Sequence, residues 1–154
     1  MKKNLERNKL VILRERANVD AKYVYKNINI NNETYSRWET GDRKVNLKGI
    51  IDISNLYNIK IDYLLDLSNS IMPTNKKYLS DKNIIGNRLK NIRINKSLSL
   101  RKENEITGVS FNAISRYERG IRLITVDALR KICDKLEIDA DELLKESESS
   151  DKEL

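Results

Sequence analysis

The 154-residue sequence has no histidine and only one cysteine, Cys133. The lack of histidine excludes imidazole-based acid–base catalysis and histidine metal ligation. A lone cysteine cannot form an intrachain disulfide or a cysteine-rich metal site, so we interpret Cys133 as a small thiol on or partly under a helix surface. The sequence also shows no nucleophile–base pair and no glycine-rich phosphate loop. We therefore expect no catalytic residue, no metal, no cofactor, no small-molecule substrate and no enzymatic activity.

Long apolar runs are missing as well. No stretch of the sequence approaches the roughly 20 apolar residues of a membrane-spanning helix, and no signal-peptide pattern opens the chain. With a single cysteine, the chain has no need of an oxidising compartment. These observations predict a soluble, reduced, cytoplasmic protein with no membrane partner.

Glycine and proline are scarce, with five and one residues. Short turns separate segments of helical length, which indicates an all-α fold. Each half of the chain is expected to form five short helices. Most of these helices start at a side chain that can accept a hydrogen bond from the first turn, whereas Lys60 is a poor N-cap for the last helix of the first half. The expected N-caps are Asp20, Asn31, Asn46, Ser99, Ser110, Thr125 and Asp139.

The most informative feature of the sequence is an internal repeat. Residues 5–65 align without a gap on residues 84–144, with an offset of 79 and thirteen identical pairs. The repeat includes the motif Tyr35–Arg43, which aligns with Ile114–Arg122. A register that holds over the whole unit indicates two copies of one small domain. We assign residues 1–67 and 83–147 to the two domains, 68–82 to a flexible linker with the only proline, and 148–154 to a disordered acidic tail.

The net charge of +7 is spread over both repeats. Residues 1–70 carry thirteen basic and nine acidic side chains, and residues 81–136 carry thirteen and six. From residue 137 onward, eight acidic and two basic side chains offset the excess positive charge of the second repeat. A basic surface suits a phosphate backbone, although many proteins of other function carry one.

The segment Leu98–Gly120 has a helix–turn–helix pattern. Gly108 supplies a left-handed turn, and Ser110 starts a helix whose polar N-terminal face can enter the major groove of DNA. With the preceding Arg93 helix and the following Thr125–Leu144 segment, it resembles the Xre/Cro-like DNA-binding domain of phage-type repressors. The resemblance covers the second repeat and, more weakly, the first, where Asn29 replaces the turn glycine. It implies two tandem repressor-like domains that bind double-stranded DNA.

The resemblance further implies that the third helix of each unit touches base edges. The residue types agree, because Arg can pair with guanine, Asn with adenine and Glu with cytosine, and Phe can contact a thymine methyl. Each could instead be an ordinary solvated residue, and Phe111 could anchor a protein interface. The expected base contacts are Asn31, Asn32, Glu33, Ser36 and Arg37 in the first unit and Ser110, Phe111, Asn112, Ser115 and Arg116 in the second.

Positive residues that follow the third helix are expected to contact phosphates, with plain solubilising charge as the alternative. They are Arg43, Lys44, Arg119 and Arg122. At the N-terminus, Lys2 and Lys3 are either a basic arm or ordinary solvated residues.

Two further features concern the framework of each unit. In the family, the positions of Arg14 with Glu39 and of Arg93 with Glu118 form an internal ion pair, while Trp38 and Tyr117 belong to the core. The second helix departs from the family pattern in both units. Where the family usually begins this helix with Gln, the chain has Ala21 in the first unit and Leu100 in the second. Where the family usually has a Leu-Ala pair inside this helix, the chain has Val24-Tyr25 and Glu103-Asn104. Because a buried unpaired polar group costs several kcal/mol, we expect a displaced second helix or new partners for these side chains.

The leading hypothesis is a sequence-specific transcriptional regulator, a repressor that occludes a promoter. Two unlike third helices predict two dissimilar half-sites about one DNA turn, or about 34 Å, apart. The alternative is an interaction protein, such as an antitoxin or a phage factor that binds a host protein, in which one unit serves dimerisation or partner binding. A homodimer or protein partner is left open.

Overall fold

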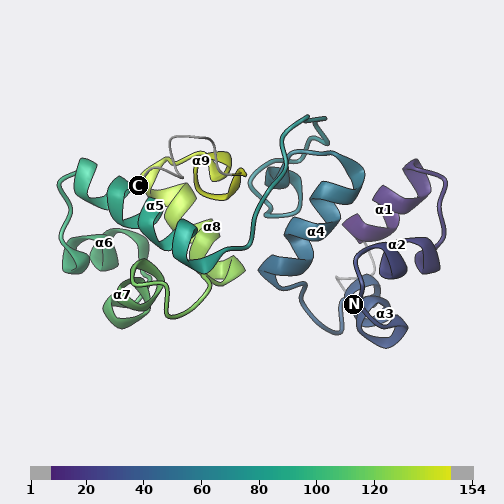
Figure 1. Ribbon diagram of the computed structural model, residues 1–154, viewed down its shortest axis with the longest axis horizontal. Coiled ribbons are helices and arrows are strands. Elements are labelled where there is room, and N and C mark those ends of the chain that lie inside the picture. Colours follow the sequence, from purple (N-terminus) through teal and green to yellow (C-terminus); the bar gives the residue numbers. More distant parts are fainter. Residues whose placement is uncertain (1–7, 147–154) are drawn as a thin grey trace.

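The structure of the protein is a computed structural model that describes residues 8–146 (Figure 1). Within that range it is helical, apart from two isolated β-bridges, so the all-α expectation is confirmed. The first unit comprises α1 Lys9–Arg16, α2 Ala21–Asn27, α3 Asn32–Thr40, α4 Leu47–Tyr57 and the 3-10 helix η2 Ile61–Tyr63. The second comprises α5 Lys82–Asn95, α6 Leu100–Thr107, α7 Phe111–Glu118, α8 Val126–Leu136 and α9 Ala140–Leu144.

Some expectations fall beyond this range. Lys2, Lys3 and the acidic tail 148–154 lie outside the described residues. Of the helices between residues 8 and 146, none has the length and apolar content needed to cross a bilayer.

Helix starts follow the capping residues of the sequence. All seven expected N-caps have an extended backbone and a side chain that accepts a hydrogen bond from the first turn of their helix. Lys60, in contrast, makes no side-chain capping bond, and the helix after it is a single 3-10 turn. The last element of the first unit is therefore shorter than its counterpart α9.

The turn between the second and third helices has the same backbone conformation in both units. Asn29 has φ 58° and Gly108 has φ 78°, both in the left-handed region. Asparagine tolerates this region better than most residues, and glycine enters it without steric cost. The predicted turn is thus confirmed for both residues.

The first unit has a core of its own beneath α3. Trp38 and Tyr35 are buried and meet edge to face, with ring centroids 6.4 Å apart. They pack with Leu10, Leu13 and Val24 from α1 and α2. Trp38 therefore belongs to the core as expected, and its counterpart Tyr117 is buried in the second unit.

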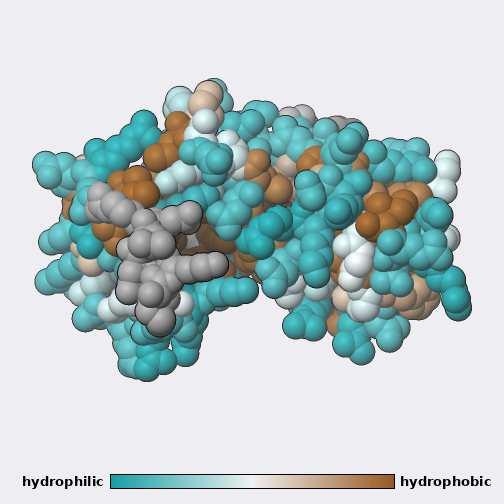
Figure 2. Space-filling view, turned by 180° about the vertical axis from the view of Figure 1, so that it is seen from behind, coloured by the Kyte–Doolittle hydropathy of each residue, from teal (hydrophilic) through white to brown (hydrophobic). Residues whose placement is uncertain are grey.

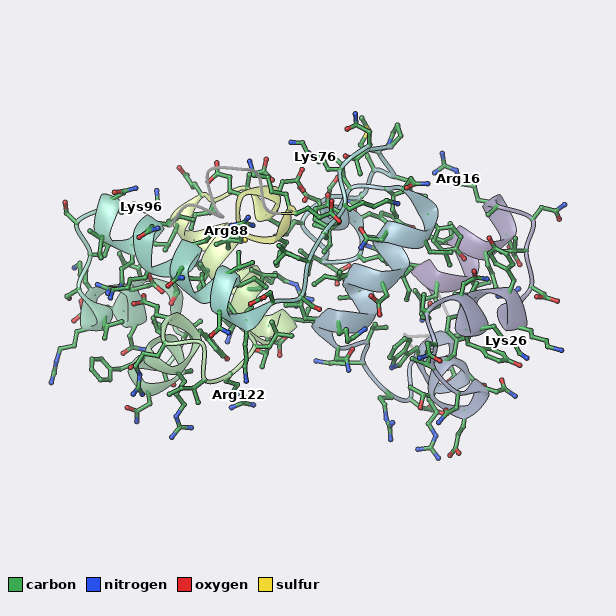
Figure 3. The ribbon with its side chains drawn as sticks, viewed as in Figure 1. Arg16, Lys26, Lys76, Arg88, Lys96 and Arg122 are labelled. Atoms are coloured by element: carbon green, nitrogen blue, oxygen red, sulfur yellow. The ribbon has the colours of Figure 1, made fainter. Side chains whose placement is uncertain are left out.

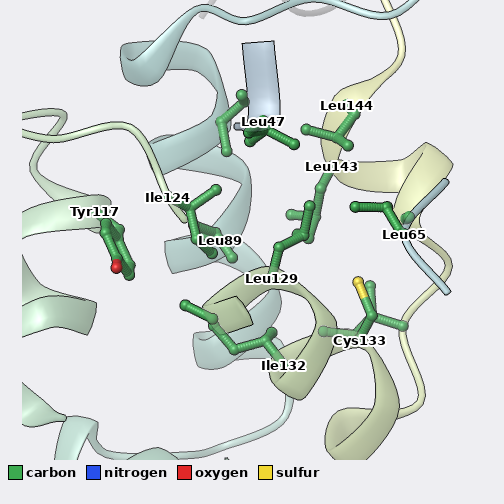
Figure 4. Close-up of a cluster of buried hydrophobic side chains, with 14 of the residues drawn as sticks. Leu47, Leu65, Leu89, Tyr117, Ile124, Leu129, Ile132, Cys133, Leu143 and Leu144 are labelled. Atoms are coloured by element: carbon green, nitrogen blue, oxygen red, sulfur yellow. The ribbon is translucent and has the colours of Figure 1, made fainter. Parts of the chain in front are cut away.

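A second core joins the two units. Leu47 and Leu65 of the first unit lie in one apolar cluster with Leu129, Leu143 and Leu144 of the second (Figure 4). Figure 1 shows α4 and α8 side by side in the middle of the molecule, with α1–α3 and α5–α7 to either side. The apolar faces of α4 and η2 are thus buried against α8 and α9 rather than against solvent.

The segment expected to be a flexible linker is tied to both units, which differs from the expectation. On the first unit, the Lys60 amide donates to the carbonyl of Met72 at 2.8 Å, and the Thr74 amide donates to the carbonyl of Asn58 at 3.0 Å. On the second, the Leu79 amide donates to the carbonyl of Leu144 at 2.8 Å. Backbone hydrogen bonds therefore hold this segment against both units.

Tyr78 is the central residue of this connection. Its side chain is buried, and its hydroxyl accepts a hydrogen bond from the Ile61 amide at 3.2 Å and donates one to Asp141 at 2.7 Å. Its backbone amide and carbonyl bond to the side-chain amide of Asn55 at 2.9 and 3.0 Å. One side chain thereby connects η2 of the first unit with α9 of the second.

We expect Tyr78→Phe to lower the free energy of unfolding by about 1–3 kcal/mol, because the buried Asp141 carboxylate loses its donor. Urea denaturation at neutral pH measures the change. Tyr23→Phe is the matched control, since Tyr23 is 47% exposed and its loss of a hydroxyl should change stability by less than about 0.5 kcal/mol. Equal unfolding midpoints for the two variants would contradict the bridging role of Tyr78.

Candidate nucleic-acid interface

An ion pair between the first and third helices fixes the third helix in each unit. In the first unit, the Arg14 guanidinium donates to both carboxylate oxygens of Glu39, at 2.7 and 3.0 Å. In the second, Arg93 donates to Glu118 at 2.7 and 2.9 Å. Both expected pairs are confirmed, and a two-bond contact restricts orientation as well as distance. The third helices α3 and α7 are therefore held rigidly against α1 and α5.

Helix α3 presents a polar face to solvent. Tyr35 and Trp38 point into the core, and this leaves the residues between them on the outside. The N-cap Asn31 accepts a hydrogen bond from the Thr34 amide at 2.7 Å. The exposed candidates on this face are Asn31, Asn32, Glu33, Ser36 and Arg37.

Helix α7 presents the corresponding face in the second unit. Ile114, Tyr117 and Glu118 are buried, and the N-cap Ser110 accepts from the Ala113 amide at 3.1 Å. Phe111 is 43% exposed, so its ring is available for contact with a partner. The other candidates on this helix are Ser110, Asn112 and Arg116, all exposed, and the half-buried Ser115.

The two exposed faces differ in charge pairing. On α3, Arg37 forms an ion pair with Glu33 one turn earlier, at 2.9 Å, and both side chains are about half exposed or more. On α7, Asn112 occupies the position of Glu33, and Arg116 makes no ion pair with another described residue. The guanidinium of Arg116 is thus freely available, whereas that of Arg37 has an intramolecular competitor.

A cleft of about 840 Å³ lies between the two units, on the side where α3 and α7 project. Figure 2 shows it from behind as a hollow at the lower edge of the molecule. Arg43 and Lys44 line it from the α3–α4 loop, and Arg122 lines it from the α7–α8 loop. None of these three side chains makes an ion pair with another residue in the described range. Figure 3 shows Arg122 extending from this lower side.

Arg119, the fourth expected phosphate contact, lies elsewhere. It is the C-cap of α7, is exposed, and donates to the carbonyl of Ser115 at 3.4 Å. It is not among the residues that line the cleft. The structure thus brings together three of the four cations and leaves Arg119 at the C-terminal end of α7, outside the lining of the cleft.

A family model described as helix-turn-helix matches the chain twice, over residues 10–64 and 89–143. The chain belongs to the helix-turn-helix family. The two matches are 79 residues apart, which is the offset of the internal repeat, and they confirm the resemblance to the Xre/Cro-like domain in two tandem copies. No curated protein and no solved structure matches the chain. As a helix-turn-helix protein, the chain is a DNA-binding regulator in general terms.

Other positively charged residues of the two helix-turn-helix units also line the cleft. Lys48 lies in the first turn of α4 and pairs with Asp52 at 2.8 Å, while Lys9 pairs with Asp66 at 2.7 Å. Arg130 donates to the carbonyl of Leu65 at 2.8 Å and so spans the two units. The helix–turn–helix pattern of the sequence does not single out these residues. Lys48 could have been found from its place in the first turn of α4, but the position of Arg130 depends on how the units pack.

The side chains that differ from the family pattern in the second helix are accommodated differently in the two units. In the first unit, Val24 is fully buried and Tyr25 lies half-buried with its ring 6.3 Å from that of Tyr35. In the second, the side chain of Asn104 donates to the carbonyl of Val109 at 2.6 Å and closes the helix–turn–helix turn. The expected new partner is therefore present for Asn104.

Glu103 remains the exception. It is 3% exposed beside the Arg93–Glu118 pair. Burial, together with the nearby Glu118 carboxylate and against the opposing effect of the Arg93 guanidinium, raises the pKa of Glu103 to about 7. The second helix-turn-helix unit therefore contains a buried carboxyl that titrates near neutral pH.

We expect Glu103→Gln to change the pH dependence of stability. Between pH 4.5, the ordinary pKa, and about pH 7 the folded wild type binds more protons than the unfolded chain, so its stability falls as pH rises through this window. The variant lacks this loss, so its free energy of unfolding should exceed that of the wild type by about 3 kcal/mol at pH 8, with little difference near pH 4.5.

Urea unfolding at a series of pH values measures the effect. Glu105→Gln, at an exposed position of the same helix, should follow the wild-type profile. A difference between Glu103→Gln and wild type that stays constant from pH 4.5 to 8 would show that Glu103 is not the titrating group.

Proposed function

We propose that the protein is a sequence-specific transcriptional regulator, a repressor of the cytoplasm, that inserts α3 and α7 into the major groove of double-stranded DNA. The observation that carries the proposal is the position of α3 and α7 on one side of the molecule, each with an exposed polar face. Arg43, Lys44 and Arg122 line the cleft between the units and have no ion-pair partner among residues 8–146. Repression follows if the bound protein covers promoter DNA that the transcription machinery needs.

Base reading is assigned to the exposed faces of α3 and α7. Arg37 and Arg116 have the reach and geometry to bind guanine with two hydrogen bonds, and Asn32 and Asn112 can do the same with adenine. Phe111 suits a thymine methyl group. We also assign base contacts to Asn31 and Ser110, whose capping hydrogen bonds fix them at the N-termini of the helices. The remaining base contacts, at shorter range, are assigned to Glu33, Ser36 and Ser115.

Phosphate binding is assigned to Arg43, Lys44 and Arg122 in the cleft and to Arg119 at the end of α7. Arg43, Lys44 and Arg122 have no ion-pair partner in the described part of the chain, so they lose no such contact there when they bind a phosphate oxygen. The cleft positions suit the stretch of backbone between the two major-groove segments, and Arg119 suits a strand at the C-terminal end of α7. These contacts supply salt-dependent affinity that does not depend on sequence.

We expect Arg116→Ala to weaken binding to the preferred site by about 1–3 kcal/mol and to relax the preference at one base pair. Arg37→Ala should do the same in the other half of the site, with the smaller loss, because Arg37 must first leave Glu33. Titrations of labelled duplexes with single-base changes measure both effects.

The matched control for these variants is Arg16→Ala. Arg16 is exposed and lies on the upper side of the molecule, away from α3, α7 and the cleft (Figure 3). Its loss should leave affinity and base preference unchanged. If Arg37→Ala and Arg116→Ala behave like this control, the third-helix faces do not read bases.

We expect Arg43→Ala and Arg122→Ala to weaken binding to all duplexes alike and to lower the slope of log affinity against log salt by about one unit each. Binding isotherms at several salt concentrations give the slope. Binding that hardly changes with salt, in wild type and variants alike, would instead favour a protein partner for this surface.

A further inference from the structure

Equivalent residues of the two units meet each other at the junction. Asp62 in η2 and Asp141 in α9 occupy the same position of the repeat, and carboxylate oxygens of these two residues lie within 4.8 Å of each other. The elements η2 and α9, which are also equivalent, pack against one another. In a head-to-tail arrangement a surface meets a different surface, whereas contact between equivalent positions indicates a two-fold relation.

The shared core has the same property. Leu65 and Leu144 are equivalent, as are Ile50 and Leu129, and all four belong to one buried cluster. A local two-fold axis therefore passes through the junction. Figure 1 agrees with this arrangement, because α1, α2 and α3 on one side match α5, α6 and α7 on the other, with α3 and α7 both at the lower edge.

The junction leaves this arrangement little freedom. Arg130 donates to the carbonyl of Leu65, and Tyr78 binds Ile61 in one unit and Asp141 in the other. The backbone of Leu79 is bonded to Leu144. Apolar packing and directed hydrogen bonds together fix the distance and the angle between α3 and α7.

A two-fold pair of reading helices matches the local dyads of duplex DNA, so its two half-sites are inverted and their spacing is set by the protein. The pair is two-fold only in its backbone, because the reading side chains differ: Asn32 corresponds to Phe111, and Glu33 to Asn112.

We propose that a single chain binds one operator composed of two unlike half-sites in inverted orientation, at one fixed spacing, with the central phosphates over the Arg43, Lys44 and Arg122 cleft. This inference rests on the proposed DNA-binding function and specifies the kind of duplex that the same surface recognises. Independently mobile units would accept direct repeats and several spacings.

The test starts with selection of duplexes from a random pool by the full-length protein at physiological salt. The selected duplex is then compared with three derivatives: one half-site reversed, about five base pairs inserted at the centre, and about ten inserted, which restores the helical phase. Single half-site duplexes give the affinity of one unit alone. Native mass spectrometry gives the number of chains per duplex.

We expect one chain per duplex. Each derivative should bind about 100-fold or more weakly than the selected duplex, down to the affinity of a single half-site, because linking two binding units raises affinity by a factor of about 10²–10⁴. Recovery of full affinity with the ten-base-pair insertion, tolerance of the reversed half-site, or two chains per duplex would each overturn the inference while leaving DNA reading intact. A pool without any enriched sequence would instead overturn the proposed function, and the inference with it.

Discussion

A helical unit of about 55 residues buries little apolar surface by itself and is only marginally stable. In this chain the two units share part of their cores, since the inner faces of α4 and η2 are covered by α8 and α9. The stability of each unit and the geometry between the units therefore have the same physical source. A substitution at Leu65 or Leu144 would affect both at once, because each side chain is fully buried in the common cluster.

Within each unit, the third helix takes its position from contacts that do not involve the exposed face. The Arg14–Glu39 and Arg93–Glu118 pairs hold it from behind, and its N-cap and the left-handed turn before it set where it begins. The outward side chains are consequently free to differ between α3 and α7 without disturbing the framework. This separation of the framework contacts from the exposed face is what permits two unlike faces on one repeated backbone.

Much of this could be predicted from the sequence, because it depends on local signals. Capping side chains such as Asp20 and Thr125 act on the next turn of chain, and the Gly108 turn is set by one residue's backbone. The junction could not be predicted in the same way. Tyr78 lies in a stretch rich in Ser, Asn and Lys, which indicates a solvated linker, and its partners are 17 and 63 residues away. One signal was available in the sequence. Ile50 and Ile51 are adjacent and both apolar, so the apolar face of α4 is wider than a single unit needs to cover its own core.

Covalent linkage of the two units also affects how occupancy would respond to protein level. Two separate chains that bind DNA only as a dimer must first associate, so at low concentration the occupancy of their DNA site rises with the square of the amount of protein. Here the junction around Tyr78 and Arg130 forms within one polypeptide. Occupancy of a target would then rise in simple proportion at low protein levels, without a threshold. Steepness in the response would have to come from neighbouring sites along the same DNA.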